Sequence, residues 1–320
     1  MVLIPIYEPT AGFRIGFNGG VGLDFITISL ISFFAVVSAF LPPLLDGVER
    51  KVRAKIQSRI GPPTVMQTWY DLRKLAVKEL KMPLGGELAV LTVFLSLITS
   101  VSSIAYLTYV LITSTLNPLS IATLIVLITA SHNLTLLSSV STSNPFSIVG
   151  SYRNVTLLLV NEFGFMAGFI ATLYALVRLS TNPTPLSFLA YALGLAALIV
   201  STYVGCGRLP YDIHEAEPEL ASGALIEFSG VALGTYLYTH LMMRYVFSLL
   251  VAYAISTLII GFTNALVVIA VLALLTSIIY ILYGVVAAML GRTRVDLGVR
   301  TLFTLYVSLT LCLVVAWLFA

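Results

Sequence analysis

The sequence has little charge and little cysteine, and each shortage excludes a class of protein. Charged residues make up 10% of its 320 residues and apolar residues 59%, whereas soluble domains carry about 25% charged residues. A soluble globular protein is therefore excluded, and we predict an all-α integral membrane protein with one polytopic membrane domain over residues 1–320. The two cysteines, Cys206 and Cys312, lack CxxC spacing and cannot by themselves ligate an iron–sulfur cluster.

Other common signatures are also missing. The N-terminal segment has no basic stretch followed by an apolar core, so we expect no cleaved signal peptide. No glycine-rich loop follows a strand pattern, no serine or threonine has the surroundings of a nucleophile, and nothing indicates nucleic-acid binding. His214 lies beside Glu215, but Pro218 and the lack of a second nearby histidine argue against a metal site.

Long apolar runs, in contrast, extend from one end of the chain to the other. Because about 20 apolar residues cross the hydrocarbon core as a helix, we expect eight transmembrane helices. They cover residues 24–45, 88–112, 119–140, 154–179, 187–205, 223–260, 264–289 and 301–319. The sixth run is too long for one upright helix and contains Arg244, so it forms either one long tilted helix or two short ones.

The positions of the basic residues decide between eight and nine spans. Nine of the seventeen bases lie in the loop 46–83, which the positive-inside rule places in the cytoplasm. With eight spans, five further arginines lie on this side. A ninth span would move Arg292, Arg294 and Arg300 outside. We therefore predict eight spans in the cell membrane, both termini outside, and an acidic cytoplasmic loop at 206–222.

An amphipathic pattern follows Gly61-Pro62-Pro63 in the basic loop. Apolar side chains recur at helical spacing among charged ones, at Trp69, Leu72, Leu75, Ala76 and Leu80. This pattern predicts a helix that lies in the interface plane of the membrane after the first span. The alternative is an ordinary basic loop packed on lipid headgroups.

Several polar groups lie within the expected spans. Glu162 lies in the fourth span, where a charged group costs roughly 2.5–3.5 kcal/mol on insertion scales, so it either faces a polar path or has a structural partner. His240, one helical turn before Arg244, either relays protons or is a buried, hydrogen-bonded histidine. For His132 we favour the structural interpretation. Gly164-x-x-x-Gly168 indicates close helix contact.

The stretch "RLPYDIHEAEPELASGALIEFSG", residues 208–230, contains five of the fourteen acidic residues. Five carboxylates close together cannot all stay ionised in a poorly hydrated setting without raising some pKa values. Such a cluster can store and pass protons or hold a cation. Solvation of a surface loop explains the first four, but not Glu227, which we expect inside the sixth helix. The residues alone thus indicate an ion-conducting membrane subunit.

Three motifs resemble those of the respiratory complex I subunit 1 family. The acidic stretch is similar to the family pattern R-x-P-[FY]-D-[IL]-x-E-[AG]-E-x-E-L. The first loop adds "ERKVRAKIQSRIGPPTVMQ" with "YDLRKLAVKE", and the fourth span adds "GSYRNVTLLLVNEF". The motifs cover most of residues 46–230 in the family's order, and eight spans agree with the family. The remaining spans match in hydropathy only.

The branch of this family can be narrowed. Only four residues separate Gly61-Pro62 from Gln67, where quinone-reducing members carry a longer insert. "GPPTVMQTWYDLRKL" and "DIHEAEPEL" are similar to segments of energy-converting membrane-bound [NiFe] hydrogenases and formate hydrogenlyases. Two departures stand out: Thr68 replaces the usual proline, and His240 stands where many members carry a glutamate.

The resemblance implies a non-catalytic anchor and ion-coupling subunit of an oxidoreductase complex. It implies no cofactor or metal in this chain, and iron–sulfur clusters and a NiFe-type centre in its partners. Those partners would be hydrogenase-like large and small subunits, a ferredoxin-like iron–sulfur subunit and antiporter-like membrane subunits. The implied ion path consists of Glu162, Asp212, Glu215, Glu217, Glu219, Glu227 and His240. The implied docking residues for the peripheral arm are Arg53, Arg59, Asp71, Lys74, Glu79, Arg153 and Arg208.

Three alternatives remain open at this point. The first is a subunit of a related sulfur-reducing complex, which would carry the same motifs. The second is a subunit of quinone-reducing complex I. The third is a stand-alone secondary transporter, which would be expected to contain internal repeats, and none is visible. The transported ion, proton or sodium, and the terminal electron acceptor are likewise left open by the residues.

Overall fold

The computed structural model describes residues 25–81, 86–113, 117–181, 183–213, 223–259 and 265–319. Within these stretches every regular element is a helix. The elements are α1 (Phe25–Ile56), α2 (Gln67–Val77), α3 (Glu87–Thr113), α4 (Pro118–Val140), α5 (Pro145–Thr181), α6 (Pro185–Gly205), the 3-10 turn η1 (Gly223–Leu225), α8 (Gly230–Ile259), α9 (Ala265–Met289) and α10 (Val295–Phe319).

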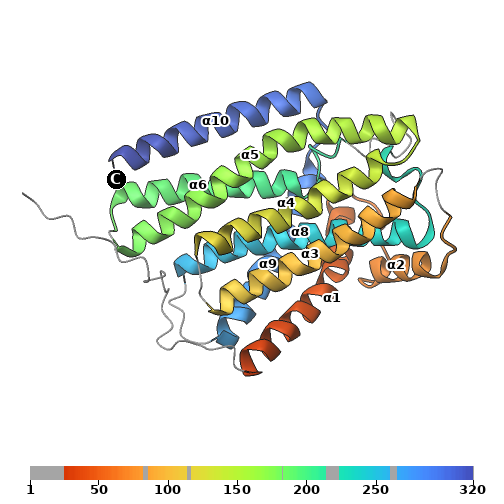
Figure 1. The fold of residues 1–320 in the computed structure, drawn as a ribbon, viewed down its shortest axis with the longest axis horizontal. Helices are drawn as coiled ribbons and strands as arrows, with labels where there is room; N and C mark the ends of the chain where they lie inside the picture. The colour runs from red at the N-terminus through yellow and green to blue at the C-terminus, as the bar shows by residue number, and fades with distance from the viewer. Residues whose placement is uncertain are drawn as a thin grey trace, which may run out of the picture.

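Eight of these helices are long and apolar enough to cross a membrane, which confirms the eight spans predicted from the sequence. They form one bundle, with α10 along one edge (Figure 1). The most apolar stretch of α8 is 83% buried inside the protein, and that of α10 only 22%. The sixth span is therefore the inner helix of the bundle, and it contacts α1, α3, α6 and α9.

Two helix boundaries differ from the expected ones, at the end of the first span and at the start of the sixth. The first helix continues to Ile56, so the loop expected from residue 46 begins only at residue 57. The sixth helix begins only at Gly230, so Glu227 precedes it instead of lying inside it. Hydropathy marks the part of a helix that lies in the hydrocarbon, but it does not mark the ends of the helix. Backbone hydrogen bonds can continue through a charged turn beyond that part.

The helix predicted after the first span is α2. It spans Gln67–Val77, so Leu80 lies beyond its end. The indole of Trp69 packs against the rings of Phe40, at 5.4 Å between centroids, and Tyr238, at 6.2 Å. The apolar side of α2 thus packs on α1 and α8, while Tyr70 and Val77 remain exposed.

Most of the described basic residues gather at one end of the bundle, which we call the basic end. It contains the last turns of α1, α4, α6 and α9, the first turns of α3, α5, α8 and α10, and the helix α2 (Figure 1). The arginines of this end include Arg50, Arg53, Arg59, Arg73, Arg153, Arg208, Arg292 and Arg294. Both cavities described below open there.

Close helix contact at Gly164-x-x-x-Gly168 is confirmed. A Cβ on Gly168 would lie 2.7 Å from the backbone nitrogen of Leu198 in α6, and one on Gly164 would lie 2.5 Å from the Tyr306 ring in α10. The Tyr306 hydroxyl donates to Asn161 Oδ1 at 2.7 Å. Small residues on α5 therefore let α6 and α10 approach, as is common between membrane helices.

Candidate functional site

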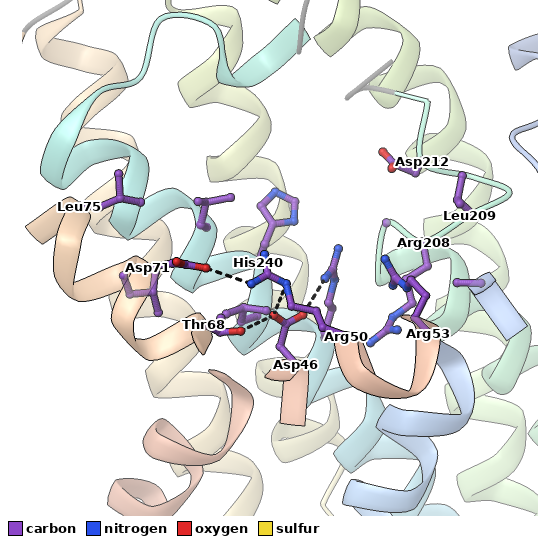
Figure 2. A pocket seen from close by; sticks show the side chains of 16 residues that line it. Asp46, Arg50, Arg53, Thr68, Asp71, Leu75, Arg208, Leu209, Asp212 and His240 are labelled. Carbon is purple, nitrogen blue, oxygen red and sulfur yellow. Dashed lines mark hydrogen bonds and ion pairs between the residues drawn. The ribbon is translucent and has the colours of Figure 1, made fainter. Parts of the chain in front are cut away.

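A polar cavity of about 300 Å³ opens at the basic end between α1, α2, α8 and the segment that follows α6 (Figure 2). We call it the central cavity. Its ionisable lining consists of the arginines Arg50, Arg53, Arg208 and Arg244, the aspartates Asp46, Asp71 and Asp212, and His240. Charges of both signs thus share one small space at the end of an apolar bundle.

Asp46 connects three helices on one side of this cavity. Its carboxylate accepts a hydrogen bond from the Thr68 hydroxyl of α2 at 2.8 Å. It lies 3.6 Å from Arg50 on its own helix and 4.0 Å from Arg244 on α8. Arg50 in turn donates to Asp71 of α2 at 3.0 Å. Ion pairs therefore run from the surface helix α2 through α1 to the inner helix α8.

A second carboxylate of α1, that of Glu49, is buried inside the protein. The side chain of Glu49 is 2% exposed and that of Arg208 is 1% exposed, with 2.5 Å between Glu49 Oε1 and Arg208 Nη1. Arg53, one turn further along α1, also donates to this oxygen. Taking such charges out of water is costly, so each depends on the others for its stability.

Aromatic and glycine residues of α9 complete the surroundings of this pair. The Arg208 guanidinium lies over the Tyr280 ring, 4.9 Å from its centroid. A Cβ on Gly284 would lie 2.3 Å from Glu49 Cγ, so α9 can pack here only without a side chain. The aromatic ring stabilises the buried guanidinium, and the close approach of α9 covers the Glu49 side chain.

The segment after α6 is held to α8 by its backbone. Arg244 Nε donates to the carbonyl oxygen of Cys206 at 3.1 Å. Burial raises the pKa of the Cys206 thiol to about 11, because the thiolate would lose its hydration. The thiol is therefore neutral at physiological pH, and Cys206 contributes packing rather than charge.

The structure brings together five of the residues that the resemblance implied. Arg53, Asp71, Arg208, Asp212 and His240 all line the central cavity. Arg208 is only 3% exposed as a whole residue, so it contacts Glu49 and Tyr280 instead of an outer surface where a partner could dock.

The remaining implied residues lie elsewhere. Arg59, Lys74 and Glu79 are exposed at the basic end. Arg153 lines a separate cavity beside α10. Three further residues, Glu215, Glu217 and Glu219, lie outside the described part of the chain.

Two glutamates of the implied ion path occupy separate positions outside the central cavity. Glu162 on α5 accepts a hydrogen bond from Asn133 Nδ2 of α4 at 3.2 Å. It lies nine residues beyond Arg153, about 14 Å along a helix. Glu227, between η1 and α8, accepts from Asn144 Nδ2 at 2.6 Å. Each carboxylate is thus paired with one asparagine of the α4–α5 region.

The two histidines of the spans have aromatic neighbours. The His240 ring lies 4.8 Å from the Tyr236 ring, and the His132 ring lies 6.0 Å from that of Phe247. Within the described stretches, no group of three or more His, Cys, Asp and Glu side chains is placed to hold a metal ion.

Sequence reasoning missed the centre of the site. Asp46 and Glu49 were not singled out, and Arg244 was noted without its partner Asp46. A local signal for both was present, because Asp46–Arg50 and Glu49–Arg53 are pairs four residues apart, a spacing at which charges meet on a helix. Because residues 46–83 were expected to form a loop, this helical spacing was not used.

The fold and the site together define a class: a polytopic membrane subunit with a charged cavity at one end. The family model described as NADH dehydrogenase matches residues 28–318. This chain belongs to that family, the NADH dehydrogenase subunit 1 family, as its three motifs predicted.

Two relatives from Escherichia coli are components of hydrogen-metabolising complexes. Hydrogenase-4 component C is 30% identical over 210 residues, which are 62% of this chain and 66% of that protein. Formate hydrogenlyase subunit 4 is 30% identical over 212 residues, 62% of this chain and 68% of that protein. The match thus spans about two thirds of the length of each relative.

A respiratory relative and a solved structure extend the comparison. A subunit of the NADH-quinone oxidoreductase of Aquifex aeolicus is 26% identical over 225 residues, 60% of this chain and 65% of that protein. A chain of the membrane-bound sulfane sulfur reductase, an archaeal respiratory membrane complex, superposes with a TM-score of 0.73 at 19% identity, covering 91% of this chain and 99% of that chain. The latter likeness shows the shared fold.

The buried ion pair generates a stability prediction. Arg208→Leu leaves the Glu49 carboxylate buried with one arginine instead of two, so we expect a loss of about 3–5 kcal/mol in unfolding free energy. Arg59→Leu, at an exposed arginine of the same end, should change stability by less than about 0.5 kcal/mol. Thermal unfolding of the detergent-purified proteins measures both.

A double substitution sharpens this test. In Glu49→Leu with Arg208→Leu both buried charges are gone, and the remaining Arg53 side chain is 32% exposed and can be hydrated. The double variant should therefore unfold at a higher temperature than Arg208→Leu alone. Equal unfolding temperatures for Arg208→Leu and Arg59→Leu would show that the pair does not stabilise the fold.

Proposed function

We propose that this chain is the membrane-anchor and ion-coupling subunit of an energy-converting membrane-bound [NiFe]-hydrogenase-type complex. In this role it links redox chemistry in a peripheral arm to translocation of protons or sodium ions across the cell membrane. The observation that carries the proposal is the pair of relatives at 30% identity, a component of hydrogenase-4 and a subunit of formate hydrogenlyase. The respiratory relative is less similar, at 26%.

The partners follow from this assignment. Electrons pass through hydrogenase-like large and small subunits and a ferredoxin-like subunit, which hold the iron–sulfur clusters and the NiFe-type centre. Antiporter-like membrane subunits move the ions. Arg59, Lys74 and Glu79, exposed at the basic end, contact the peripheral arm. A sulfur-reducing complex is the second candidate, because a chain of the sulfane sulfur reductase has the same fold.

The composition of the native complex tests the assignment. We expect the tagged chain to co-purify with iron–sulfur subunits and with nickel in about equimolar amount, as bound nickel is the mark of a NiFe-type centre. Elemental analysis of the purified complex gives the nickel content, and mass spectrometry identifies the subunits. A complex with iron–sulfur subunits but no nickel would support the sulfur-reducing candidate or quinone-reducing complex I, and an active monomer would support the transporter.

We propose that the basic end faces the cytoplasm and that both termini lie outside, following the positive-inside rule. In a Cys312→Ser background, which removes the exposed native thiol, Arg59→Cys and Pro183→Cys place single accessible cysteines at opposite ends of the bundle. A membrane-impermeant maleimide added to intact cells should label Pro183→Cys and spare Arg59→Cys. The reverse pattern would contradict the orientation.

The ion path in this proposal includes Glu162 and Glu227, with the central cavity as the link to the peripheral arm. A carboxylate at membrane depth is costly, and Glu162 has Asn133, a neutral amide, as its hydrogen-bonding partner. Such a partner satisfies the carboxyl group without neutralising it, so the group remains able to gain and lose a proton. His240, on the wall of the central cavity, is the third titratable group of this path.

Replacement of either glutamate by glutamine tests this path. Glutamine keeps the shape and can still accept from Asn133 or Asn144, so assembly and electron transfer should survive. Ion transport per electron should fall by about ten-fold or more, because a positioned proton-transfer group is lost. Sealed vesicles with a pH-sensitive or sodium-sensitive probe measure the ratio.

The control is Glu87→Gln, at an exposed glutamate in the first turn of α3, which should transport normally. Because the two groups act in series, the double replacement should be little worse than the more damaging single one. Normal transport by both single variants would assign Glu162 and Glu227 to structure alone.

A further inference from the structure

A second polar cavity, of about 390 Å³, lies at the basic end beside α10. We call it the arginine cavity, and its charged lining consists of Arg153, Arg292, Arg294 and Asp296. Asp212 lies nearby and pairs with Arg292 at 3.4 Å. Three arginines therefore face two aspartates. A cavity with a surplus of positive charge attracts anions.

Hydrogen bonds to the backbone hold the segment that lines this cavity. The link 290–294 joins α9 to α10, and both the backbone nitrogen and the hydroxyl of Thr293 donate to the carbonyl of Pro210 at 3.0 Å. The carbonyl of Arg294 accepts from Gly298 at 2.9 Å, which starts α10. The first turn of α10 therefore borders the cavity, and its N-terminal dipole adds to the positive potential.

The arginine cavity lies at the level of the membrane surface. Two candidate membrane spans, Val267–Met289 and Val295–Trp317, end and begin on either side of the short link. Since both helices cross the bilayer, the link between them lies where headgroups meet water. The cavity is thus at the depth of lipid phosphates.

An apolar wall leads from the cavity toward the bilayer core. α10 runs along the edge of the bundle and contacts α5 and α6 (Figure 1). Leu297, in its first turn, is 55% exposed, and Phe303 is 57% exposed. An amphiphile with its headgroup in the cavity would find these exposed apolar side chains further along α10.

We propose that the arginine cavity binds the phosphate group of an anionic membrane phospholipid, whose acyl chains lie along α10 at Leu297 and Phe303. The positive charge, the depth and the apolar wall together match a lipid. A free phosphate would interact only with the positive charge. An acidic protein surface would not need apolar side chains that face the lipid. Basic pockets between membrane helices on the cytoplasmic side bind headgroups in this manner.

Arg294 is the residue to substitute. Arg292 pairs with Asp212, which also lines the central cavity, so a change there would disturb both sites. The complex is purified in a neutral detergent with the wild-type chain, with Arg294→Gln, or with the control Arg73→Gln. Arg73 is an exposed arginine of α2 that lines neither the arginine cavity nor the central cavity, and it lies off the helix α10 along which the acyl chains are placed.

The measurement is the binding of phosphatidylglycerol, titrated into each complex and counted by native mass spectrometry. Arg294→Gln should weaken one binding event about five-fold, since a base near the membrane surface contributes roughly 1 kcal/mol. Arg73→Gln should leave this event unchanged, and Asp296→Asn should strengthen it. Phosphatidylcholine, which carries no net charge, should bind equally to all variants.

Three outcomes would overturn the proposal. Equal phosphatidylglycerol binding by Arg294→Gln and Arg73→Gln would mean that the cavity holds no lipid. Displacement of phosphatidylglycerol by inorganic phosphate at the same concentration would make it a site for free anions. Loss of a peripheral subunit from the Arg294→Gln complex, with lipid binding intact, would assign the arginines to a protein contact. The two lipid-binding readouts do not depend on which redox partner the complex carries.

Discussion

A single buried carboxylate, that of Glu49, holds the basic end of this protein together. It pairs with Arg208 and Arg53, and Gly284 of α9 packs against its side chain. Charges removed from water are stable only with partners in place, so the end of α1, the segment after α6 and the face of α9 must assemble together. The central cavity opens beside this group because the arginine that closes the pair, Arg208, also forms its wall.

The Asp46 network extends this assembly outward. Asp71 on α2 is bonded to Arg50, Arg50 to Asp46, and Asp46 lies 4.0 Å from Arg244 of the inner helix α8. A contiguous series of ion pairs therefore joins a partly exposed helix to the most buried helix of the bundle. The network thus connects α2 to α8 through direct contacts of α1.

Local chemistry in the sequence was enough for the helices and the family. Each span is an apolar run long enough to cross the hydrocarbon, a requirement that depends on nothing else in the chain. The helix α2 follows from its own periodicity. The motif residues were also recognisable as short strings, and four residues of these motifs, Arg53, Asp71, Arg208 and Asp212, line the central cavity.

Only the tertiary structure decided what these residues contact. Arg208 was expected on a docking surface, but its partner Glu49 lies on α1, far away in the chain, and the pair is buried. Arg244 was noted as a polar group at membrane depth, yet its partner Asp46 had been assigned to a loop. Hydropathy and spacing are properties of one segment, whereas burial and ion pairing depend on which segments pack together. The sequence therefore determined how many helices cross the membrane, and packing decided which charges they enclose.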